Sequence, residues 1–199
     1  HLMANHLLEN AAALLTVGSL FNGNLTERWK RTGSKILDQE VREQILPDGM
    51  HFERSPMYHL RIFNVLKETR LLLKSNEENH LKPILRSMEK ALDLVRHPDE
   101  DIALLNDSNL GVYPLPLESN NSFSPMPGPW QLPDAGYYGY RGSNGEYIIF
   151  DAGPIGPDYN PGHSHGDMFS YEVTWDYHRM IVDTGNFDYE PGLMRFHCR

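Results

Sequence analysis

The sequence predicts an α+β protein in which a helical region precedes an antiparallel β-sheet. Apolar residues recur at helical spacing as far as Arg96, and after Gly136 the apolar pattern changes to a period of two residues. Between these regions, prolines recur among serine and asparagine residues, which is typical of a long ordered connection. We therefore divide the chain into a helical region at 1–97, a Pro-rich connection at 98–136 and a sheet region at 137–199.

The composition sets outer limits on structure and function. The 199 residues are 40% hydrophobic and 23% charged, which is ordinary for a globular protein with one sizeable core or two small ones. A formal net charge of −9 argues against nucleic-acid binding. Cys198 is the one cysteine, and no apolar run approaches the roughly 20 residues of a membrane span. Because the sequence begins at His1 within a helical pattern, we expect a piece of a longer protein; its composition fixes no oligomeric state.

The first helix is expected at 3–21 and is apolar nearly all round, which predicts a buried helix. Its polar residues gather at one end, where Asn5 and Glu9 lie four positions apart, as do His6 and Asn10. Burying four polar groups is costly. A cleft wall therefore explains them at least as well as hydrogen-bonded core positions or a frayed helix end.

Three further helices are expected at 24–46, 55–74 and 79–96. Asn24 and Glu27 form a capping-box pattern at the start of the second helix, and Ser55 with Pro56 provides an N-cap and a first-turn proline for the third. The turn residues at 47–49 separate these two helices. The short loops predict antiparallel neighbouring helices.

The sheet region should contain at least four strands. Residues 137–141 and 146–150 flank a Gly-Ser-Asn-Gly sequence, which indicates a hairpin, and two further strand-like runs lie at 168–175 and 179–183. The helices should cover this antiparallel sheet, with a cleft where the two layers meet.

A loop with two histidines precedes the third of these runs. His163, His165 and Asp167 lie between glycines, and such a group suits metal binding, proton transfer or both. The alternative is a His-rich surface loop, because short motifs often occur without function. A metal site would need three or four ligands, and Asp183 could join His165, although simple hairpin pairing places Asp183 opposite about Ser170. Asp167 is expected to orient a histidine or the loop backbone.

Tyr58 is the second candidate for chemistry. Ser55 as N-cap places Tyr58 in the first helical turn, beside Arg54. We expect this environment to lower the pKa of the phenol, which could then donate or accept a proton. The alternatives are a packed tyrosine and a surface ion pair between Glu53 and Arg54.

These residues together resemble the heparinase II/III-like polysaccharide lyases, a group that includes oligoalginate lyases. The resemblance rests on four segments in the same order, spread over nearly the whole chain: 5–10, 46–59, 162–167 and 182–185. It implies part of an (α/α) toroid followed by the start of an antiparallel β-sandwich domain. It also implies an anionic, uronic-acid-containing polysaccharide as substrate and a periplasmic or secreted location.

The resemblance assigns roles to individual residues. Asn5 and His6 would contact and neutralise the uronate carboxylate, with Glu9 assisting. Tyr58 would be the general acid, and in some members also the base, while His163 would be the second proton-transfer or neutralising group.

Further roles concern the substrate and a metal. We take Arg54 as an additional substrate-binding candidate beside Tyr58. His165 and Asp183 match the metal-ligand positions of zinc-containing members, whose further histidine ligand lies downstream of Arg199, so the zinc site is incomplete in this chain.

The expected reaction is β-elimination at a 4-linked uronide, which leaves an unsaturated end. Amide and imidazole donors stabilise the developing enediolate, and tyrosine and histidine move the proton. Hydrolytic glycosidases instead use a carboxylate pair, and nothing positions Glu9 and Glu53 as such a pair. Two alternatives stay open: a non-catalytic carbohydrate-binding or structural domain, and a metal-dependent hydrolase or cupin-like enzyme that uses His163 and His165.

Overall fold

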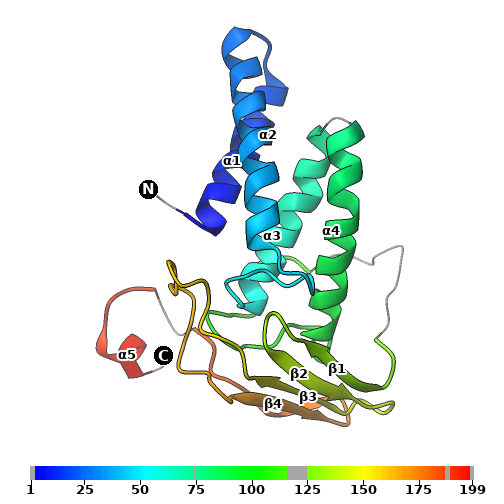
Figure 1. Ribbon diagram of the computed structural model, residues 1–199. Helices are drawn as coiled ribbons and strands as arrows, with labels where there is room; N and C mark the ends of the chain where they lie inside the picture. Colours follow the sequence, from blue (N-terminus) through cyan, green and yellow to red (C-terminus); the bar gives the residue numbers. More distant parts are fainter. Residues whose placement is uncertain (1–2, 74, 116–124, 187–188, 198–199) are drawn as a thin grey trace.

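The structure is a computed structural model that describes residues 3–73, 75–115, 125–186 and 189–197. Helices lie over one face of a five-stranded antiparallel sheet (Figure 1). The predicted order, helices first and sheet second, is confirmed. Within the described ranges, no helix combines the length and apolar character needed to cross a membrane.

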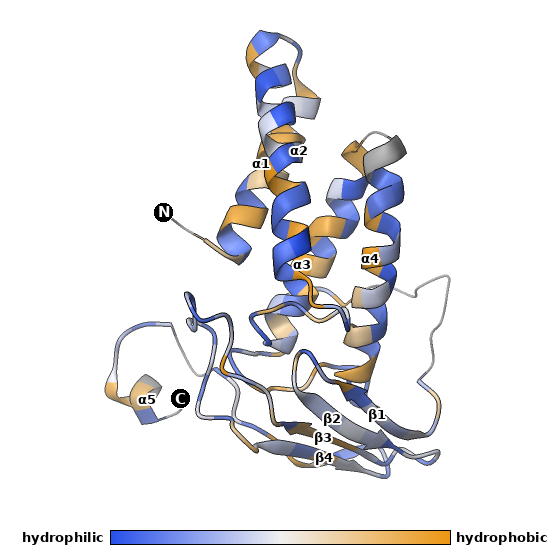
Figure 2. Ribbon diagram, in the orientation of Figure 1, coloured by the Kyte–Doolittle hydropathy of each residue, from blue (hydrophilic) through white to orange (hydrophobic). Residues whose placement is uncertain are grey.

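The first two helices form an antiparallel pair, α1 (Asn5–Leu20) and α2 (Asn24–Gln44). Gly33 allows their close approach, because a Cβ atom there would lie 2.7 Å from the Ala11 carbonyl oxygen. Figure 2 shows α2 as largely hydrophilic on the visible side. The predicted capping box is wrong: Gly23 is the N-cap residue and no side chain caps the helix. The φ angle of 137° at Gly23 explains this, since it favours glycine at that position.

The third and fourth helices are α3 (Pro56–Thr69), followed by the 3₁₀ turn η1 (Arg70–Leu72), and α4 (Ser75–Leu94). The predicted cap of α3 is confirmed, because Ser55 accepts a hydrogen bond from the Tyr58 backbone N–H at 3.4 Å. The prediction placed the start of α4 four residues too late, since it relied on an apolar pattern that begins at Leu81.

The sheet contains β1 (Gly128–Leu132), β2 (Tyr137–Arg141), β3 (Tyr147–Asp151), β4 (Tyr171–Trp175) and β5 (His178–Ile181), in that spatial order. Neighbouring strands pair antiparallel, and the hairpin that was predicted around residues 142–145 joins β2 to β3.

Two elements were not predicted. Strand β1 lies inside the segment interpreted as a Pro-rich connection, where the prolines obscured a short run of alternating residues. A short helix, α5 (Leu193–His197), follows the sheet. The predicted connection therefore contributes to the sheet layer as well as linking it to the helices.

The two faces of the sheet differ in burial. Tyr137 and Tyr147 on the inner face are buried and belong to the same core cluster as the helices. On the outer face, Tyr138, Phe150 and Tyr171 pair across three neighbouring strands and remain 39–43% exposed. An apolar outer face of this kind is suited to packing against the second sheet of a β-sandwich.

Buried polar contacts fasten the sheet to the helical region. Glu172 is fully buried on β4 and accepts a hydrogen bond from the Leu104 backbone N–H at 2.7 Å. Its Oε2 also lies 2.7 Å from Nε2 of His97, whose other ring nitrogen lies 2.6 Å from Oγ1 of Thr174. The segment between α4 and β1 is thus anchored to the sheet where it leaves the helices.

Candidate active site

Tyr58 lies at the start of α3, in the region where the helices meet the loops above the sheet. Ser55 holds this end of the helix, because its hydroxyl caps Tyr58 and also donates to the Asp107 carbonyl oxygen at 2.9 Å. The Tyr58 side chain is buried, and its hydroxyl lies 3.4 Å from that of Tyr189.

The predicted lowering of the Tyr58 pKa is wrong. Burial raises the pKa of this phenol well above its usual value, and the hydrogen bond with Tyr189 raises it further. The guanidinium of Arg54 does not offset this rise in the pKa, because it donates its hydrogen bonds to backbone carbonyl oxygens and not to the phenol. Tyr58 is therefore a protonated donor at neutral pH.

His163 lies directly against Tyr58. The two rings are stacked, with centroids 3.7 Å apart and planes inclined by 27°. Tyr58 and His163 therefore meet in space, although they lie in different parts of the chain. Their catalytic roles stay predictions at this point.

Asp107 organises both histidines of the loop. Its Oδ2 lies 2.9 Å from Nδ1 of His163 and its Oδ1 lies 3.1 Å from Nε2 of His165. Burial alone would raise the pKa of this carboxyl, but the hydrogen bonds from the two histidines outweigh burial and bring the pKa to about 2. Because an ionised carboxylate only accepts hydrogen bonds, His163 donates through Nδ1 and keeps Nε2 for the site.

Glu53 supplies a second carboxyl group beside His163. Its side chain is almost fully buried, and its Oε2 lies 3.7 Å from Nε2 of His163 and 3.8 Å from Nδ1 of His51. Burial raises the pKa of Glu53 to about 7, although the charge of His163 acts in the opposite direction. The alternative of a surface pair between Glu53 and Arg54 is excluded, since both residues are buried and no hydrogen bond joins them among those of the described residues.

The polar residues at the start of α1 separate into different environments. Asn5 is fully buried; its backbone N–H donates to the Glu53 carboxyl group, and its side-chain Nδ2 has no hydrogen-bond partner within the described residues. His6 is exposed, whereas Glu9 is half-buried and forms an ion pair with Arg61. Asn5 thus joins the group around Glu53 and His163, and the ion-pair partner of Glu9, Arg61, lies 5.8 Å from the centre of the Tyr58 ring.

Arg54 is placed differently from its predicted partner Tyr58. Its guanidinium donates to the carbonyl oxygens of Phe52, Asp134 and Ala135, and these contacts attach the loop before α3 to the turn before β2. Burial lowers its pKa. The geometry favours a structural role, and the proposed contact with substrate stays a prediction.

The metal-ligand candidates lie on the sheet side of the loop. Burial raises the pKa of Asp183 to about 6; the charge of Asp167 acts in the same direction and that of His165 in the opposite one, so these groups are close enough to influence one another. Asp167 accepts a hydrogen bond from the Asn106 backbone N–H, so the backbone that it holds belongs to the segment between α4 and β1 and not to its own loop. Over the ranges that the structure describes, no group of three or more His, Cys, Asp or Glu side chains is arranged to hold a metal ion. Binding of zinc through His165 and Asp183 stays a prediction.

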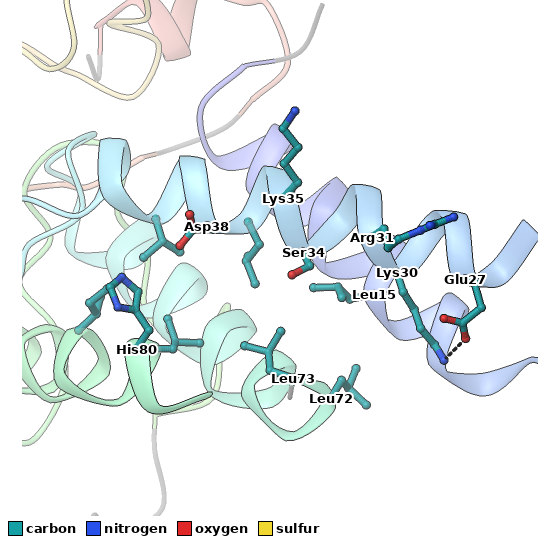
Figure 3. Close-up of a pocket in the computed structure, with 14 residues that line it drawn as sticks. Leu15, Glu27, Lys30, Arg31, Ser34, Lys35, Asp38, Leu72, Leu73 and His80 are labelled. Atoms are coloured by element: carbon teal, nitrogen blue, oxygen red, sulfur yellow. Dashed lines mark hydrogen bonds and ion pairs between the residues drawn. The ribbon is translucent and has the colours of Figure 1, made fainter. Parts of the chain in front are cut away.

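One cavity of the structure lies away from these residues. A space of about 480 Å³ opens between α2 and the segment formed by η1 and α4, as Figure 3 shows. Leu15, Leu72 and Leu73 line its apolar part, and Asp38 and His80 lie at one end. None of the predicted site residues borders it. We take the cluster around Tyr58 and His163 as the candidate site because the titratable groups converge there.

Sequence reasoning missed Asp107 altogether. It lies in the segment assigned to the Pro-rich connection, where an isolated Asn-Asp-Ser sequence gave no periodic signal. Sequence analysis considered Glu53 only as a surface partner of Arg54 or, with Glu9, as a carboxylate pair that nothing positions. A local hint was available: Glu53 lies within the resembling segment 46–59 and precedes the N-cap residue Ser55 by two positions.

Comparisons with known proteins place the chain in a family. Residues 1–118 match the family description "Heparinase II/III N-terminus", and residues 124–197 match "Heparinase II/III-like, C-terminal". A heparin-sulfate lyase of Bacteroides thetaiotaomicron is 32% identical over 117 residues, covering 52% of this chain and 17% of that protein. A heparin-sulfate lyase of Pedobacter heparinus is 29% identical over 110 residues, with the same two coverages.

Solved structures agree on the fold. The crystal structure of heparan sulfate lyase HepC from Pedobacter heparinus has a TM-score of 0.75 at 21% identity, covering 99% of this chain and 35% of that chain. A crystal structure of heparinase III has a TM-score of 0.77 at 21% identity, covering 98% of this chain and 37% of that chain. The chain thus spans about a third of the solved relatives, which combine a toroid with a β-sandwich. The two matched family regions together show that the chain belongs to the heparinase II/III family.

Proposed function

We propose that the protein carrying this chain is a polysaccharide lyase that cleaves uronic-acid-containing glycans by β-elimination and leaves unsaturated ends. The observation that carries this proposal is the stacked contact between Tyr58 and His163 at 3.7 Å, together with the buried Asn5 side chain, whose Nδ2 has no hydrogen-bond partner among the described residues. A protonated phenol, an imidazole with a free nitrogen and an amide donor are the groups that this elimination needs. Membership of the family and the names of the relatives support the same reaction.

The geometry suggests that the two rings have different roles, one as proton acceptor and the other as proton donor. Nε2 of His163 takes the proton from the carbon next to the uronate carboxylate, because Asp107 keeps the other ring nitrogen as a donor. Tyr58 gives its proton to the leaving glycosidic oxygen, since its raised pKa keeps the phenol protonated. The C–H and C–O bonds break as the new C=C bond forms, and Asn5 with His6 faces the carboxylate that gathers negative charge.

Heparan sulfate is the first substrate to test, because the curated relatives are named heparin-sulfate lyases. A periplasmic or secreted location would suit an enzyme acting on such a polymer. Zinc is also part of the proposal, with His165 and Asp183 as two of its ligands; a third would have to come from outside the described residues.

A substrate screen tests the proposed function. The complete gene product is incubated separately with heparan sulfate, alginate, hyaluronan and chondroitin, and the unsaturated ends are followed by their ultraviolet absorbance. We expect new absorbance with at least one uronate polymer. Binding to a polymer without a new double bond would instead support a carbohydrate-binding domain. New reducing ends without absorbance, lost completely on chelation, would support a metal-dependent hydrolase.

A further inference from the structure

A guanidinium group borders the candidate proton donor. Arg61 lies three positions after Tyr58 on α3, which places both side chains on one surface of the helix. Its Cζ atom lies 5.8 Å from the centre of the Tyr58 ring and 5.4 Å from that of the Tyr113 ring. The side chain of Arg61 is 27% exposed, so part of the guanidinium is accessible to a ligand. Arg61 thus places a permanent positive charge beside the residue that is proposed to protonate the leaving group.

Glu9 on α1 fixes the orientation of this guanidinium. Its Oε1 accepts a hydrogen bond from Nε of Arg61, and its Oε2 accepts one from Nη2 at 2.7 Å. Such a two-point contact occupies one edge of the planar guanidinium. Burial alone would lower the pKa of Arg61, but the hydrogen bond with Glu9 outweighs burial and raises this pKa, so the group stays charged. Helices α1 and α3 together therefore hold the charge in one place.

The contact with Glu9 leaves other N–H groups of Arg61 for a ligand. A guanidinium has five N–H donors, and Glu9 accepts two of them. Tyr113 is a further hydrogen-bonding neighbour: burial raises the pKa of its phenol, and a hydrogen bond with Arg61 acts in the opposite direction. Two N–H groups of Arg61 therefore remain, and planar guanidinium donors suit the oxygens of a bound oxyanion.

The other arginine of the site is more enclosed. Arg54 directs its three nitrogens to backbone carbonyl oxygens, and the residue is 8% exposed. Asp107, on the other side of the candidate site, is negatively charged, and the chain as a whole carries a net charge of −9. A polyanionic substrate needs a locally positive surface within such an acidic protein. Arg61 supplies a positive charge of this kind beside Tyr58.

We propose that Arg61 binds an oxyanion, a carboxylate or a sulfate, on the sugar residue that carries the leaving glycosidic oxygen, and that Glu9 is the positioning residue that holds Arg61 for this contact. The location follows from the neighbourhood of Tyr58, which is proposed to protonate the same oxygen. In this arrangement Glu9 acts through Arg61 and does not touch the substrate. The proposal rests on the β-elimination proposed above and deepens it, because it assigns a negative charge to the second sugar as well.

A binding experiment tests this site without relying on turnover. The complete gene product carrying Tyr58→Phe is titrated calorimetrically with three probes: a sulfated heparan sulfate tetrasaccharide, its unsulfated counterpart and an alginate tetrasaccharide. Adding Arg61→Gln should raise the Kd of at least one probe roughly 10- to 100-fold, because a charge-assisted hydrogen bond is lost. Binding of that probe should also become less sensitive to salt.

The three probes distinguish the two sources of the oxyanion. A rise in Kd confined to the sulfated probe identifies a sulfate as the group that Arg61 binds, whereas a rise for alginate or for the unsulfated probe identifies a carboxylate. If Arg61→Gln leaves all three Kd values in place, or if no probe binds, the proposal is wrong. Binding that depends on Arg61, found without turnover by the wild type, would contradict the lyase and preserve this site.

Kinetics provide the second test. Arg61→Gln should raise KM roughly 10- to 100-fold and leave kcat within about 3-fold, because a contact made equally in the ground state and the transition state affects KM alone. Arg96→Gln is the matched control, since Arg96 is 20% exposed and pairs with Asp93 at 3.4 Å at the end of α4. An equal rise in KM in both variants would show that the loss of any half-buried arginine has this effect.

The positioning role of Glu9 is tested with a double variant. Glu9→Gln loosens the hold on Arg61 but keeps its charge, so KM should rise less than in Arg61→Gln. Glu9→Gln combined with Arg61→Gln should match Arg61→Gln alone, because Glu9 acts through that one side chain. Additive effects would instead show that Glu9 contacts the substrate itself. The double variant also replaces Arg61→Gln if that protein fails to fold, since it leaves no half-buried carboxylate without a partner.

Discussion

Tyr58 and His163 form a face-to-face pair, with ring centroids 3.7 Å apart and an interplanar angle of 27°. The pair joins the first turn of α3 to the loop before β4, so the helical region and the sheet each supply one ring. A tyrosine and a histidine in such contact can act on the same substrate, the histidine as proton acceptor and the tyrosine as proton donor. The site therefore depends on how the two regions are fastened together.

The first prediction concerns Tyr58. In the complete gene product, Tyr58→Phe should lower kcat by a factor of about 10²–10⁴, because the ring still stacks on His163 but has no proton to donate. The unsaturated product is measured by ultraviolet absorbance. Tyr140→Phe is the control, since Tyr140 lies on β2 with its side chain 49% exposed. Near-normal turnover in Tyr58→Phe would remove Tyr58 from the mechanism.

The second prediction concerns Asp107. Replacing it by Asn leaves two buried imidazole donors with a weaker partner, so we expect a loss of about 1–3 kcal/mol in the free energy of unfolding at pH 7. Chemical denaturation measures this difference. Asp38→Asn, which removes an exposed ion pair with Arg42, should cost less than about 0.5 kcal/mol.

The pH dependence of the Asp107 effect has a definite sign. The folded-state pKa of about 2 is below the usual value of 3.8, so ionised Asp107 stabilises the protein above about pH 4. This contribution is lost as the pH falls towards 2, where the carboxyl becomes protonated. The difference between wild type and Asp107→Asn should therefore shrink in that window. A difference that stays constant down to pH 2 would show that the ionised carboxylate is not its source.

The sequence predicted the fold well where a periodic signal existed. Helical spacing located α1 to α4, and Ser55 with Pro56 identified the start of α3 because capping is a local property. Strand β1 was missed because its flanking prolines resemble those of a connection, and Gly23 replaced the predicted cap because of its backbone conformation. The ends of helices and strands depend on local backbone conformation, which the spacing of hydrophobic residues does not predict.

The candidate site was only partly predictable for a different reason. Tyr58, His163 and Asn5 were identified from local patterns and from the resembling segments, whereas Asp107 acts through its position in space alone. The pKa of Tyr58 was predicted with the wrong sign, since the helix terminus and Arg54 are visible in the sequence and burial is not. The contacts of Asp107 and the burial of Tyr58 both depend on residues far apart in the chain. Such contacts cannot be predicted from the local patterns of a single sequence.

The third prediction tests zinc. If His165 and Asp183 are two of its ligands, the complete gene product should contain about one zinc ion per chain, measured by elemental analysis. His165→Gln and Asp183→Asn should each reduce that content, whereas His178→Gln, an exposed substitution on β5, should not. Zinc-free protein with full lyase activity would show that these two residues serve another purpose.

The fourth prediction separates the two roles considered for Arg54. Its guanidinium donates to three backbone carbonyl oxygens, and a lysine cannot reproduce this planar set of donors. We expect Arg54→Lys to lower the free energy of unfolding by about 1–3 kcal/mol, because buried carbonyl groups lose their partners. KM for the polysaccharide should change less than about 2-fold at a temperature where the variant is folded. The control is Arg42→Lys, which alters an exposed guanidinium that pairs with Asp38. A large rise in KM for Arg54→Lys without a loss of stability would restore Arg54 as a substrate-binding residue, since a structural contact affects folding before it affects affinity.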